Sequence, residues 1–303
     1  MKVEQLPPER VGELAAVYND HVADVPLSEA VSVERFAEIW AWRSDRSAQL
    51  ETEQAIYAAG EKGGHVGFAH VALGRFPGPE LRGDQQPGPT GVIRLITYPP
   101  GRRDAGQALL EAAEARLMGQ GASRILAFLN NGYLFQRFAY GELPDTCGHL
   151  VALLGMNGYR VARGEVFMRY ANFVTEETIL PDSRADLSVA HIPQTTGTRD
   201  SIRIVVRERG ELIGICEGHS LGLWGSSDRS HATAVLGPMD VEDAFQGRGW
   251  GRFLADAMLG EARELGYRHT ATSTQQENHR AQLFYTNMGY RVTDVAHSWL
   301  KDL

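Results

Sequence analysis

The chain has 303 residues, of which 43% are hydrophobic and 22% charged, an ordinary globular composition long enough for two domain cores. A formal net charge of −8 argues against nucleic acid as the main partner, because phosphate binding requires a basic surface. The two cysteines, Cys147 and Cys216, are too few for a disulfide framework. No signal core and no apolar run of about 18 residues is present, so we expect a cytoplasmic protein without a membrane partner.

The first half of the chain alternates helical and strand signals. Two helix-like stretches, 8–19 and 33–43, precede a strand pair at 55–60 and 65–72, and another helical run opens at Arg103. A strand at 124–129 is followed by residues 130–148, whose aromatic side chains are Tyr133, Phe135, Phe138 and Tyr140. These aromatics suit a loop over an interface and the wall of an acceptor pocket equally well.

Three motifs recur in the same order in the two halves. The pairs are 65–69 with 212–216, 103–108 with 246–251, and 158–161 with 289–292. Two copies of one α/β unit explain this order. We expect a domain over 1–170, a linker over 171–200 and a second domain over 201–303, because Pro181 and Pro193 suit a loop better than the two helices that open the first copy.

A glycine-rich run carries the chemistry of the second copy. A buried strand at 232–241 and an acidic turn precede Gln246-Gly247-Arg248-Gly249-Trp250-Gly251, and helical spacing begins at Arg252. Strand, glycine-rich turn and helix expose backbone N–H groups at a helix N-terminus, where the helix dipole favours a pyrophosphate. Glycines allow positive φ and a close approach, while Arg248 and Arg252 add positive charge.

Other phosphate loops fit this run less well. The spacing is Gly-x-Gly-x-Gly rather than the Gly-x-Gly-x-x-Gly of a dinucleotide fingerprint, and no Gly-Lys-Ser/Thr ending marks a Walker loop. A simple tight turn explains one glycine but not three glycines with two arginines. The run therefore indicates a phosphate-bearing ligand.

The residues downstream narrow the family. After a strand expected at 268–274 comes Asn278-x-x-Ala-x-x-Phe-Tyr-x-x-x-Gly-Tyr, which ends at Tyr290. This pattern, following Gln-x-x-Gly-x-Gly, resembles the GNAT acyltransferase superfamily over about residues 203–303. A weaker version covers the first half, so the chain resembles a tandem GNAT protein. The resemblance implies an α/β (α+β) fold of two domains, each with a mixed, mostly antiparallel central sheet flanked by helices.

The resemblance also implies an acetyl-CoA site in the second domain. Backbone groups of Met239, Asp240 and Val241 would bind the pantetheine arm. Gln246, Gly247, Arg248, Gly249, Trp250, Gly251 and Arg252 would surround the pyrophosphate. Asn278 would contact the pantetheine region, although it could equally be a turn or helix-cap residue.

Tyr285 resembles the residue that protonates the departing thiolate. A phenol with an ordinary pKa near 10 can donate to a thiolate of similar basicity, and the alternative is an aromatic that packs on the sheet. A neutral amine would attack the thioester directly, with the oxyanion stabilised by the Val241 N–H. No metal is required.

The general base does not follow from the motif. Side chains on the same strand face as Val241 are found by counting back in twos, and the only one of them that could act as a base is His231. Asp240 lies on the opposite face unless a bulge turns it toward the acceptor. Glu217, His219 and a water chain are the alternatives, of which we select Glu217.

The first copy departs from the family pattern. Pro99 and Pro100 remove two backbone donors before the Arg103-x-x-Gly-x-Ala motif, and Leu154 stands at the position equivalent to Tyr285. We expect residues 1–170 to be catalytically silent and to complete the acceptor site or the interface.

We therefore expect an acetyl-CoA-dependent N-acyltransferase that acetylates the primary amine of a small molecule, as a monomer or homodimer. The retained Tyr285 favours this enzyme over a non-catalytic acyl-CoA-binding or regulatory protein. Protein amines are a third class of acceptor, for which an acidic groove could attract the cation.

Overall fold

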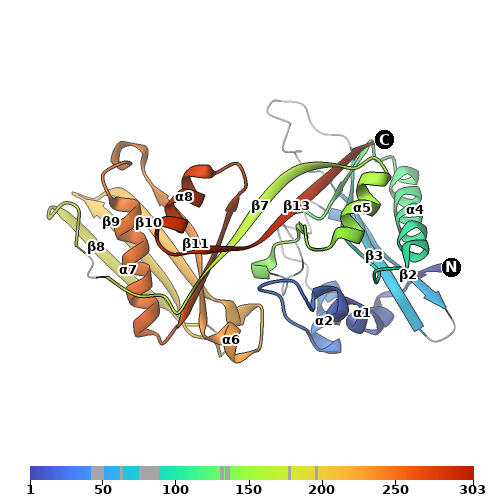
Figure 1. Ribbon diagram of the computed structural model, residues 1–303, viewed down its shortest axis with the longest axis horizontal. Helices are drawn as coiled ribbons and strands as arrows, with labels where there is room; N and C mark the ends of the chain where they lie inside the picture. Colours follow the sequence, from blue (N-terminus) through green and yellow to red (C-terminus); the bar gives the residue numbers. More distant parts are fainter. Residues whose placement is uncertain are drawn as a thin grey trace. The chain divides into compact units, whose positions relative to one another are not determined.

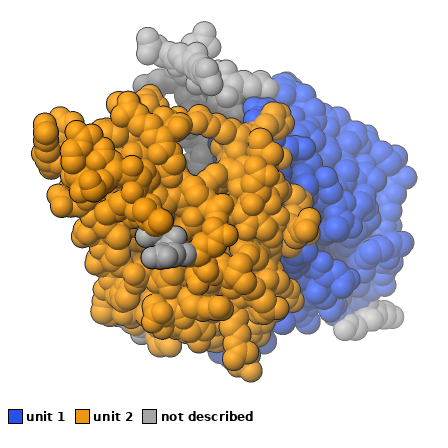
Figure 2. Space-filling model, turned by 60° about the vertical axis from the view of Figure 1, so that its left-hand side comes forward, with its two compact units in different colours: residues 1–166, 275–277, 294–303 blue, residues 167–274, 278–293 orange. Residues whose placement is uncertain are grey.

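The computed structural model describes residues 1–41, 51–61, 64–74, 89–129, 133, 137–176, 179–194 and 197–303 (Figure 1). These residues form two compact units, coloured separately in Figure 2. Unit 1 comprises residues 1–166, 275–277 and 294–303, and unit 2 comprises residues 167–274 and 278–293. The end of the chain thus belongs to unit 1, whereas the sequence pattern assigned all of 201–303 to the second domain.

Unit 1 contains a mostly antiparallel sheet in the order β1-β2-β3-β4-β5-β13. Its strands are β1 (Lys2–Leu6), β2 (Glu51–Glu61), β3 (Gly64–Gly74), β4 (Thr90–Thr97), β5 (Arg124–Ala127), the short β6 (Leu143–Pro144) and the larger part of β13 (Arg291–Asp302). The predicted pair in the first half is confirmed as β2 and β3. Among the described residues of unit 1, only β4 and β5 pair in parallel, and α4 connects them.

Helices cover both faces of this sheet. They are η1 (Pro8–Leu14), α1 (Ala15–Val22), α2 (Val33–Ala41), α4 (Arg103–Gly119), η2 (Arg137–Ala139) and α5 (Gly148–Met156). A side chain on Gly67 of β3 would meet Leu109 of α4, while Phe68 packs on Phe36 of α2. Because successive strand residues face opposite sides, α4 and α2 lie on opposite faces. Residues 42–43 of the predicted second helix, and Phe135, lie outside the described residues.

Unit 2 repeats this plan without the first pair of helices. Its strand order is β7-β12-β11-β10-β9-β8, and β11 with β12 is again the parallel pair. The strands are β7 (Arg160–Ala171, which starts in unit 1), β8 (Ala185–Ile192), β9 (Ser201–Glu208), β10 (Glu211–Ser220), β11 (Thr233–Val241) and β12 (His269–Gln275). The helices are η3 (Leu221–Leu223), α6 (Asp228–His231), η4 (Asp243–Phe245), α7 (Trp250–Glu264) and α8 (His279–Asn287).

The two units confirm the α/β repeat and the mixed, mostly antiparallel sheets. Among the described residues of the segment 171–200 no helix occurs, as Pro181 and Pro193 suggested. The segment 171–200 is nevertheless more than a linker, because it contains β8, which pairs with β9 along its whole length. No helix in the described part of the chain is long and apolar enough to span a membrane.

Candidate functional site

The parallel strands of unit 2 separate before they end. Only Thr233, Ala234 and Val235 of β11 pair with β12, although β11 continues to Val241. On its other edge, β11 has an irregularity: Cys216 pairs with Met239 and Gly218 with Leu236, so Gly237 and Pro238 lie opposite the single residue Glu217. A bulge increases local twist and bends the strand, which accounts for a gap between β11 and β12.

The backbone of β11 presents hydrogen-bonding groups to this gap. Glu242 donates its N–H to Ile213 on the β10 side at 2.9 Å. Because the direction of N–H and C=O groups alternates along an antiparallel pair, Asp240 faces β10 while Met239 and Val241 face the gap. The backbone groups of Met239 and Val241 are therefore oriented toward the gap, where the predicted pantetheine contacts would require them. The backbone groups of Asp240 point away from the gap.

The glycine-rich run forms a cradle at the start of α7. Gly247 has φ of 75° and Gly249 has φ of 89°, left-handed values that suit glycine. Gly249 is the N-cap of α7 and no side chain caps the helix, so its first N–H groups have no intrahelical partner. A side chain on Gly247 or Gly251 would extend into open space. These features fit an anion bound at a helix N-terminus.

The polar side chains of the cradle have distinct roles. Gln246 donates to the carbonyl of Val241 at 3.0 Å and to Asp243 at 2.9 Å, and so braces the turn. Arg252 is engaged by Asp256 at 2.5 Å and Glu176 at 2.9 Å. Arg248 lies over the ring of Phe245 and forms no ion pair with a described residue. Arg248 is therefore the better candidate for a phosphate contact, and Trp250 is buried in the core instead.

Tyr285 lies on α8, beside the point where the strands separate. It is 6% exposed, and its ring packs against Phe284 and Tyr290. Thr272 of β12 hydrogen-bonds the phenol and also donates to the carbonyl of Leu236 on β11 at 3.2 Å. Burial raises the pKa of Tyr285 above 10, and the Thr272 hydrogen bond opposes this in part. The phenol stays protonated at neutral pH and can act as a proton donor.

Asn278 is a helix cap. Its side-chain oxygen accepts a hydrogen bond from the N–H of Ala281 at 3.1 Å, at the start of α8. This is the alternative that the sequence left open for this residue.

Glu217 and His219 share the face of β10 that α7 does not cover. A side chain on Gly214 or Gly218 would meet Leu254 or Met258 of α7, and odd-numbered residues face the other way. Glu217 lies 3.5 Å from Arg203 in an ion pair. His219 bonds Ser201 through Nδ1 at 2.9 Å. A Cβ on Gly237 would be 3.5 Å from His219 Nε2, so the imidazole lies against the bulge.

His219 is poised to accept a proton. Burial lowers the pKa of His219 below its ordinary 6.5, and Glu217 opposes the shift. The imidazole is therefore mostly neutral at pH 7. With the hydrogen on Nδ1, it donates to Ser201 and leaves the Nε2 lone pair free beside Gly237. The selected residue, Glu217, is partly neutralised by Arg203, so the geometry favours His219.

The corresponding gap in unit 1 is bridged. Tyr98, directly after β4, donates to the carbonyl of His149 at 3.0 Å, and His149 Nε2 bonds the carbonyl of Tyr98 at 2.9 Å. These bonds connect the end of β4 to the first turn of α5, the helix that follows β5. A side chain on Gly106 would overlap the Tyr98 ring, so the motif glycine accommodates an aromatic ring.

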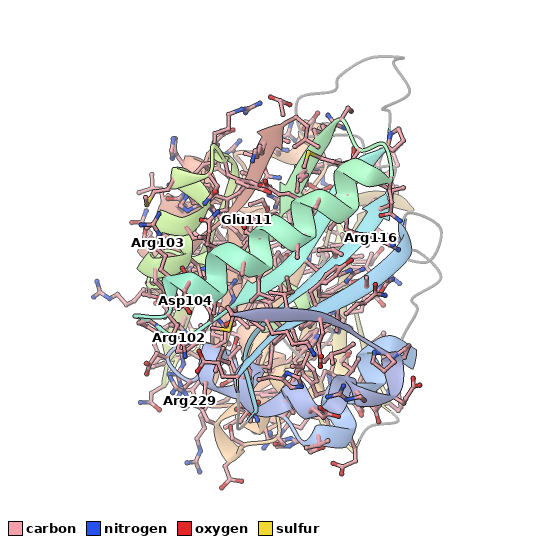
Figure 3. All side chains as sticks on the ribbon, turned by 90° about the vertical axis from the view of Figure 1, so that its right-hand side faces the viewer. Arg102, Arg103, Asp104, Glu111, Arg116 and Arg229 are labelled. Carbon is pink, nitrogen blue, oxygen red and sulfur yellow. The ribbon has the colours of Figure 1, made fainter. Side chains whose placement is uncertain are left out.

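The helix of unit 1 also starts one turn earlier relative to its motif. Figure 3 labels Arg102, Arg103 and Asp104 at the start of α4. Arg103 is the first residue of α4, whereas its motif partner Gln246 lies four residues before α7. Arg102 is paired with Glu61 at 2.6 Å and with Asp104 at 3.1 Å. The motif therefore forms no cradle in unit 1, and Leu154, at the position equivalent to Tyr285, is buried in the core.

Substitution of the N-cap glycine tests the cradle. We expect Gly249→Ala to weaken CoA binding about tenfold. The cradle that binds CoA requires the left-handed conformation at this position, and adopting it costs a non-glycine residue about 1–2 kcal/mol. Isothermal titration calorimetry with CoA measures the effect. Gly260→Ala, in the middle of α7 with open space around its Cα, is the matched control and should bind CoA normally. Equal affinities for the two variants would contradict the cradle.

No group of three or more His, Cys, Asp or Glu side chains suited to a metal ion occurs among the residues that the structure describes.

Sequence patterns gave no indication of Ser201 or Thr272, because each acts through a neighbouring strand. The bulge at Gly237–Pro238 was detectable as a Gly-Pro pair within a strand.

Comparison with known proteins finds a family match over the part of the chain that contains this site. The model of the acetyltransferase (GNAT) family matches residues 169–290. No curated protein matches the chain. A tandem GNAT protein from the clavulanic acid biosynthesis pathway is similar in fold, with 13% identity and a TM-score of 0.71, covering 99% of this chain and 98% of that one.

Two further solved structures share this fold. A GCN5-related N-acetyltransferase from Sphaerobacter thermophilus has 14% identity and a TM-score of 0.63, covering 99% of this chain and 95% of that one. A fungal GCN5-related glucosamine N-acetyltransferase region has 15% identity and a TM-score of 0.66; the match covers 99% of this chain and 38% of that multi-domain protein.

Proposed function

We propose that this chain, whose residues 169–290 match the acetyltransferase (GNAT) family model and whose fold is similar to that of a tandem GNAT protein, transfers an acetyl group from acetyl-CoA to the primary amine of a small molecule. The observation that carries the proposal is one constellation in unit 2. The gap between β11 and β12, the glycine cradle before α7 and the buried phenol of Tyr285 lie around β11. They suit the pantetheine arm, the pyrophosphate and the thioester sulfur of acetyl-CoA, in that order. Acetyl-CoA is a co-substrate that supplies the acetyl thioester.

Each part of this constellation has a proposed role. The N–H groups of the α7 N-terminus bind the pyrophosphate, with Arg248 adding charge. The backbone of Met239 and Val241 binds the pantetheine arm, and one of their N–H groups stabilises the oxyanion. Tyr285 donates a proton to the departing sulfur. His219 removes a proton from the attacking ammonium or from the tetrahedral intermediate, and Ser201 holds its ring.

This assignment moves the base from Glu217 to His219. Glu217 keeps a secondary role, because its negative charge raises the pKa of His219. It also offers a carboxylate to an incoming ammonium group. Ser201 is a positioning residue, since it acts only through His219.

The pH dependence of kcat/KM distinguishes the two bases. If His219 is the base, activity falls as the pH drops through its pKa, so we expect an acid limb with an apparent pKa below 6.5. Glu217→Gln should shift this limb to lower pH, because it removes the charge that raises the His219 pKa. His219→Gln should remove the limb and lower the rate about 10²- to 10⁴-fold. Loss of activity in Glu217→Gln, with His219→Gln active, would restore Glu217 as the base.

The reaction itself is tested by CoA release. The full chain is incubated with acetyl-CoA and a library of primary amines, and acetylated products are identified by mass spectrometry. Turnover with at least one amine supports the proposal, whereas CoA binding without turnover supports a non-catalytic acyl-CoA-binding protein. Calorimetry should give one CoA per chain, because the Tyr98–His149 bridge closes the gap in unit 1.

A further inference from the structure

Unit 1 contains a cavity that the proposed reaction does not use. Its volume is about 450 Å³, within the range of small-molecule pockets. It lies between α1, the start of β3, the segment after β4 and the start of α5. Apolar side chains provide much of the wall: Val17, Val25, Val66, Pro99 and Pro100.

The titratable groups of the cavity differ in charge. Burial lowers the pKa of His21 to about 4 and lowers that of His149, so both imidazoles are uncharged at neutral pH. Burial raises the pKa of the Cys147 thiol to about 11, so it stays protonated. Among the residues that the structure describes, no lysine or arginine lines the cavity. The two imidazoles and the thiol therefore contribute no charge to the cavity.

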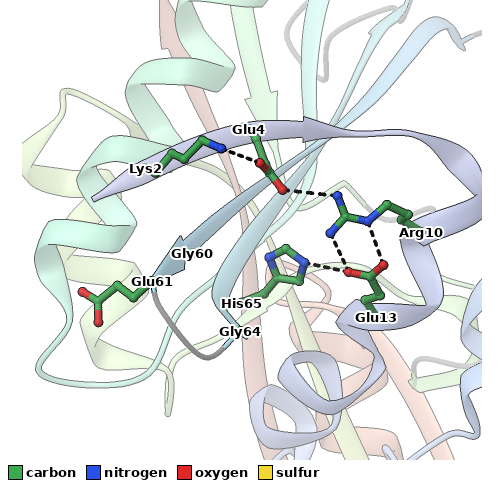
Figure 4. A pocket seen from close by; sticks show the side chains of 8 residues that line it. All are labelled: Lys2, Glu4, Arg10, Glu13, Gly60, Glu61, Gly64 and His65. Carbon is green, nitrogen blue, oxygen red and sulfur yellow. Dashed lines mark hydrogen bonds and ion pairs between the residues drawn. The ribbon is translucent and has the colours of Figure 1, made fainter.

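His65 is the remaining imidazole, and its partners lie outside the cavity. Figure 4 shows it in the neighbouring pocket, where Nε2 bonds Glu13 at 3.0 Å. Glu13 is paired with Arg10 at 2.7 Å, and Arg10 also contacts Glu4. His65 is thus held by this network outside the cavity.

Two carboxylates remain without a counter-charge. Asp20 and Asp24 line the cavity one helical turn apart, at and just beyond the end of α1. Neither forms an ion pair or a side-chain hydrogen bond with a described residue. The cavity thus combines an apolar wall with two unpaired negative charges at its exposed edge.

We propose that this cavity binds a small organic cation, an ammonium group attached to an apolar body. The ammonium group pairs with Asp20 and Asp24, and the apolar body contacts the valine and proline wall. The bound molecule is not acetylated there, because the Tyr98–His149 bridge closes the adjacent gap and Leu154 replaces the phenol. The site is separate from the acyl-transfer site of unit 2 and does not rest on the proposed function.

Three probes of one shape test the charge preference. Benzylamine, benzyl alcohol and benzoate are titrated into the full chain by calorimetry. Benzylamine should bind at least tenfold more tightly than the alcohol, and benzoate should not bind, because an anion is repelled by both carboxylates. Equal binding of the amine and the alcohol, or binding of none of the probes, would overturn the proposal.

Variants assign the binding to unit 1. Asp20→Asn/Asp24→Asn should weaken benzylamine binding about tenfold without unfolding the protein, since both side chains are exposed. Val66→Trp, which fills part of the cavity, should weaken it independently of charge. Glu217→Gln is the matched control: it removes a carboxylate from unit 2 and should keep the binding. Loss of binding in Glu217→Gln alone would place the amine in unit 2 and overturn the proposal.

A CoA titration tests the cation-binding cavity of unit 1 and the acyl-transfer site of unit 2 independently. The Asp20/Asp24 double variant should bind CoA with unchanged affinity, because the carboxylates line a cavity of unit 1 only. Failure of the proposed acyltransferase reaction would leave benzylamine binding intact.

Discussion

Replacing Tyr285 with phenylalanine is expected to lower kcat about 10²- to 10⁴-fold while leaving CoA affinity nearly unchanged, because the variant loses the proton donor and its hydrogen bond with Thr272 but keeps the ring. The ring is held by Phe284 and Tyr290, and these contacts survive the substitution. Steady-state CoA release and calorimetric CoA binding, measured on the same preparation, give the two quantities. The prediction depends on the phenol, which burial keeps protonated at neutral pH.

Tyr290→Phe is the matched control for this prediction. Tyr290 is also buried, meets Tyr285 edge-on at a centroid distance of 5.3 Å, and accepts a hydrogen bond from the Thr270 hydroxyl at 2.9 Å. Removing the Tyr290 hydroxyl should cost about 1 kcal/mol of stability and leave kcat within a few-fold of the original. If Tyr285→Phe and Tyr290→Phe behave alike, Tyr285 is a packing aromatic, the alternative that the sequence also allowed.

The local features of the site could be predicted from the sequence. Left-handed glycines, a helix start and a helix cap depend on neighbouring residues, so Gly247, Gly249 and the alternative for Asn278 followed from spacing. The two copies were also detectable, because each repeats a strand pair, a helix and a parallel strand in one order.

Features that depend on pairing between strands could not be predicted. Which residue faces the gap is set by the bulge at Gly237–Pro238, and the bulge is defined only by the register with β10. His219 is favoured over Glu217 for the same reason: its partners, Ser201 and Gly237, lie on β9 and β11.

The motif of the first copy shows a further limit. The Arg103-x-x-Gly-x-Ala pattern is intact, yet α4 begins at Arg103 and Gly106 packs on Tyr98. A glycine needed for ring packing and a glycine needed for phosphate binding look the same in one sequence. Pro99 and Pro100 were the informative residues, since they follow β4 where backbone donors would be needed.

A buried ion pair in unit 1 should produce the largest loss of stability. Arg137 and Asp294 are both nearly inaccessible to solvent and lie 2.8 Å apart. Arg137 also donates to the carbonyl of Glu142. Replacing Arg137 with methionine leaves the Asp294 carboxylate buried without its cation, so we expect a loss of about 3–5 kcal/mol in the free energy of unfolding. Urea unfolding followed by far-UV circular dichroism measures this loss.

Two further variants separate charge burial from the loss of an arginine. Arg35→Met breaks an exposed pair with Glu38 on α2 and should cost no more than about 1 kcal/mol. The double variant Arg137→Met/Asp294→Leu removes both charges and should recover most of the stability, because the unpaired carboxylate is then absent.

The loss in the free energy of unfolding of Arg137→Met should also be smaller at low pH. Burial already raises the pKa of Asp294 and Arg137 opposes that rise, so without Arg137 the carboxyl takes up a proton more readily. A loss below about 1 kcal/mol in Arg137→Met would show that water or a neighbouring group compensates Asp294, and that β13 is held in unit 1 by its strand pairing and apolar contacts.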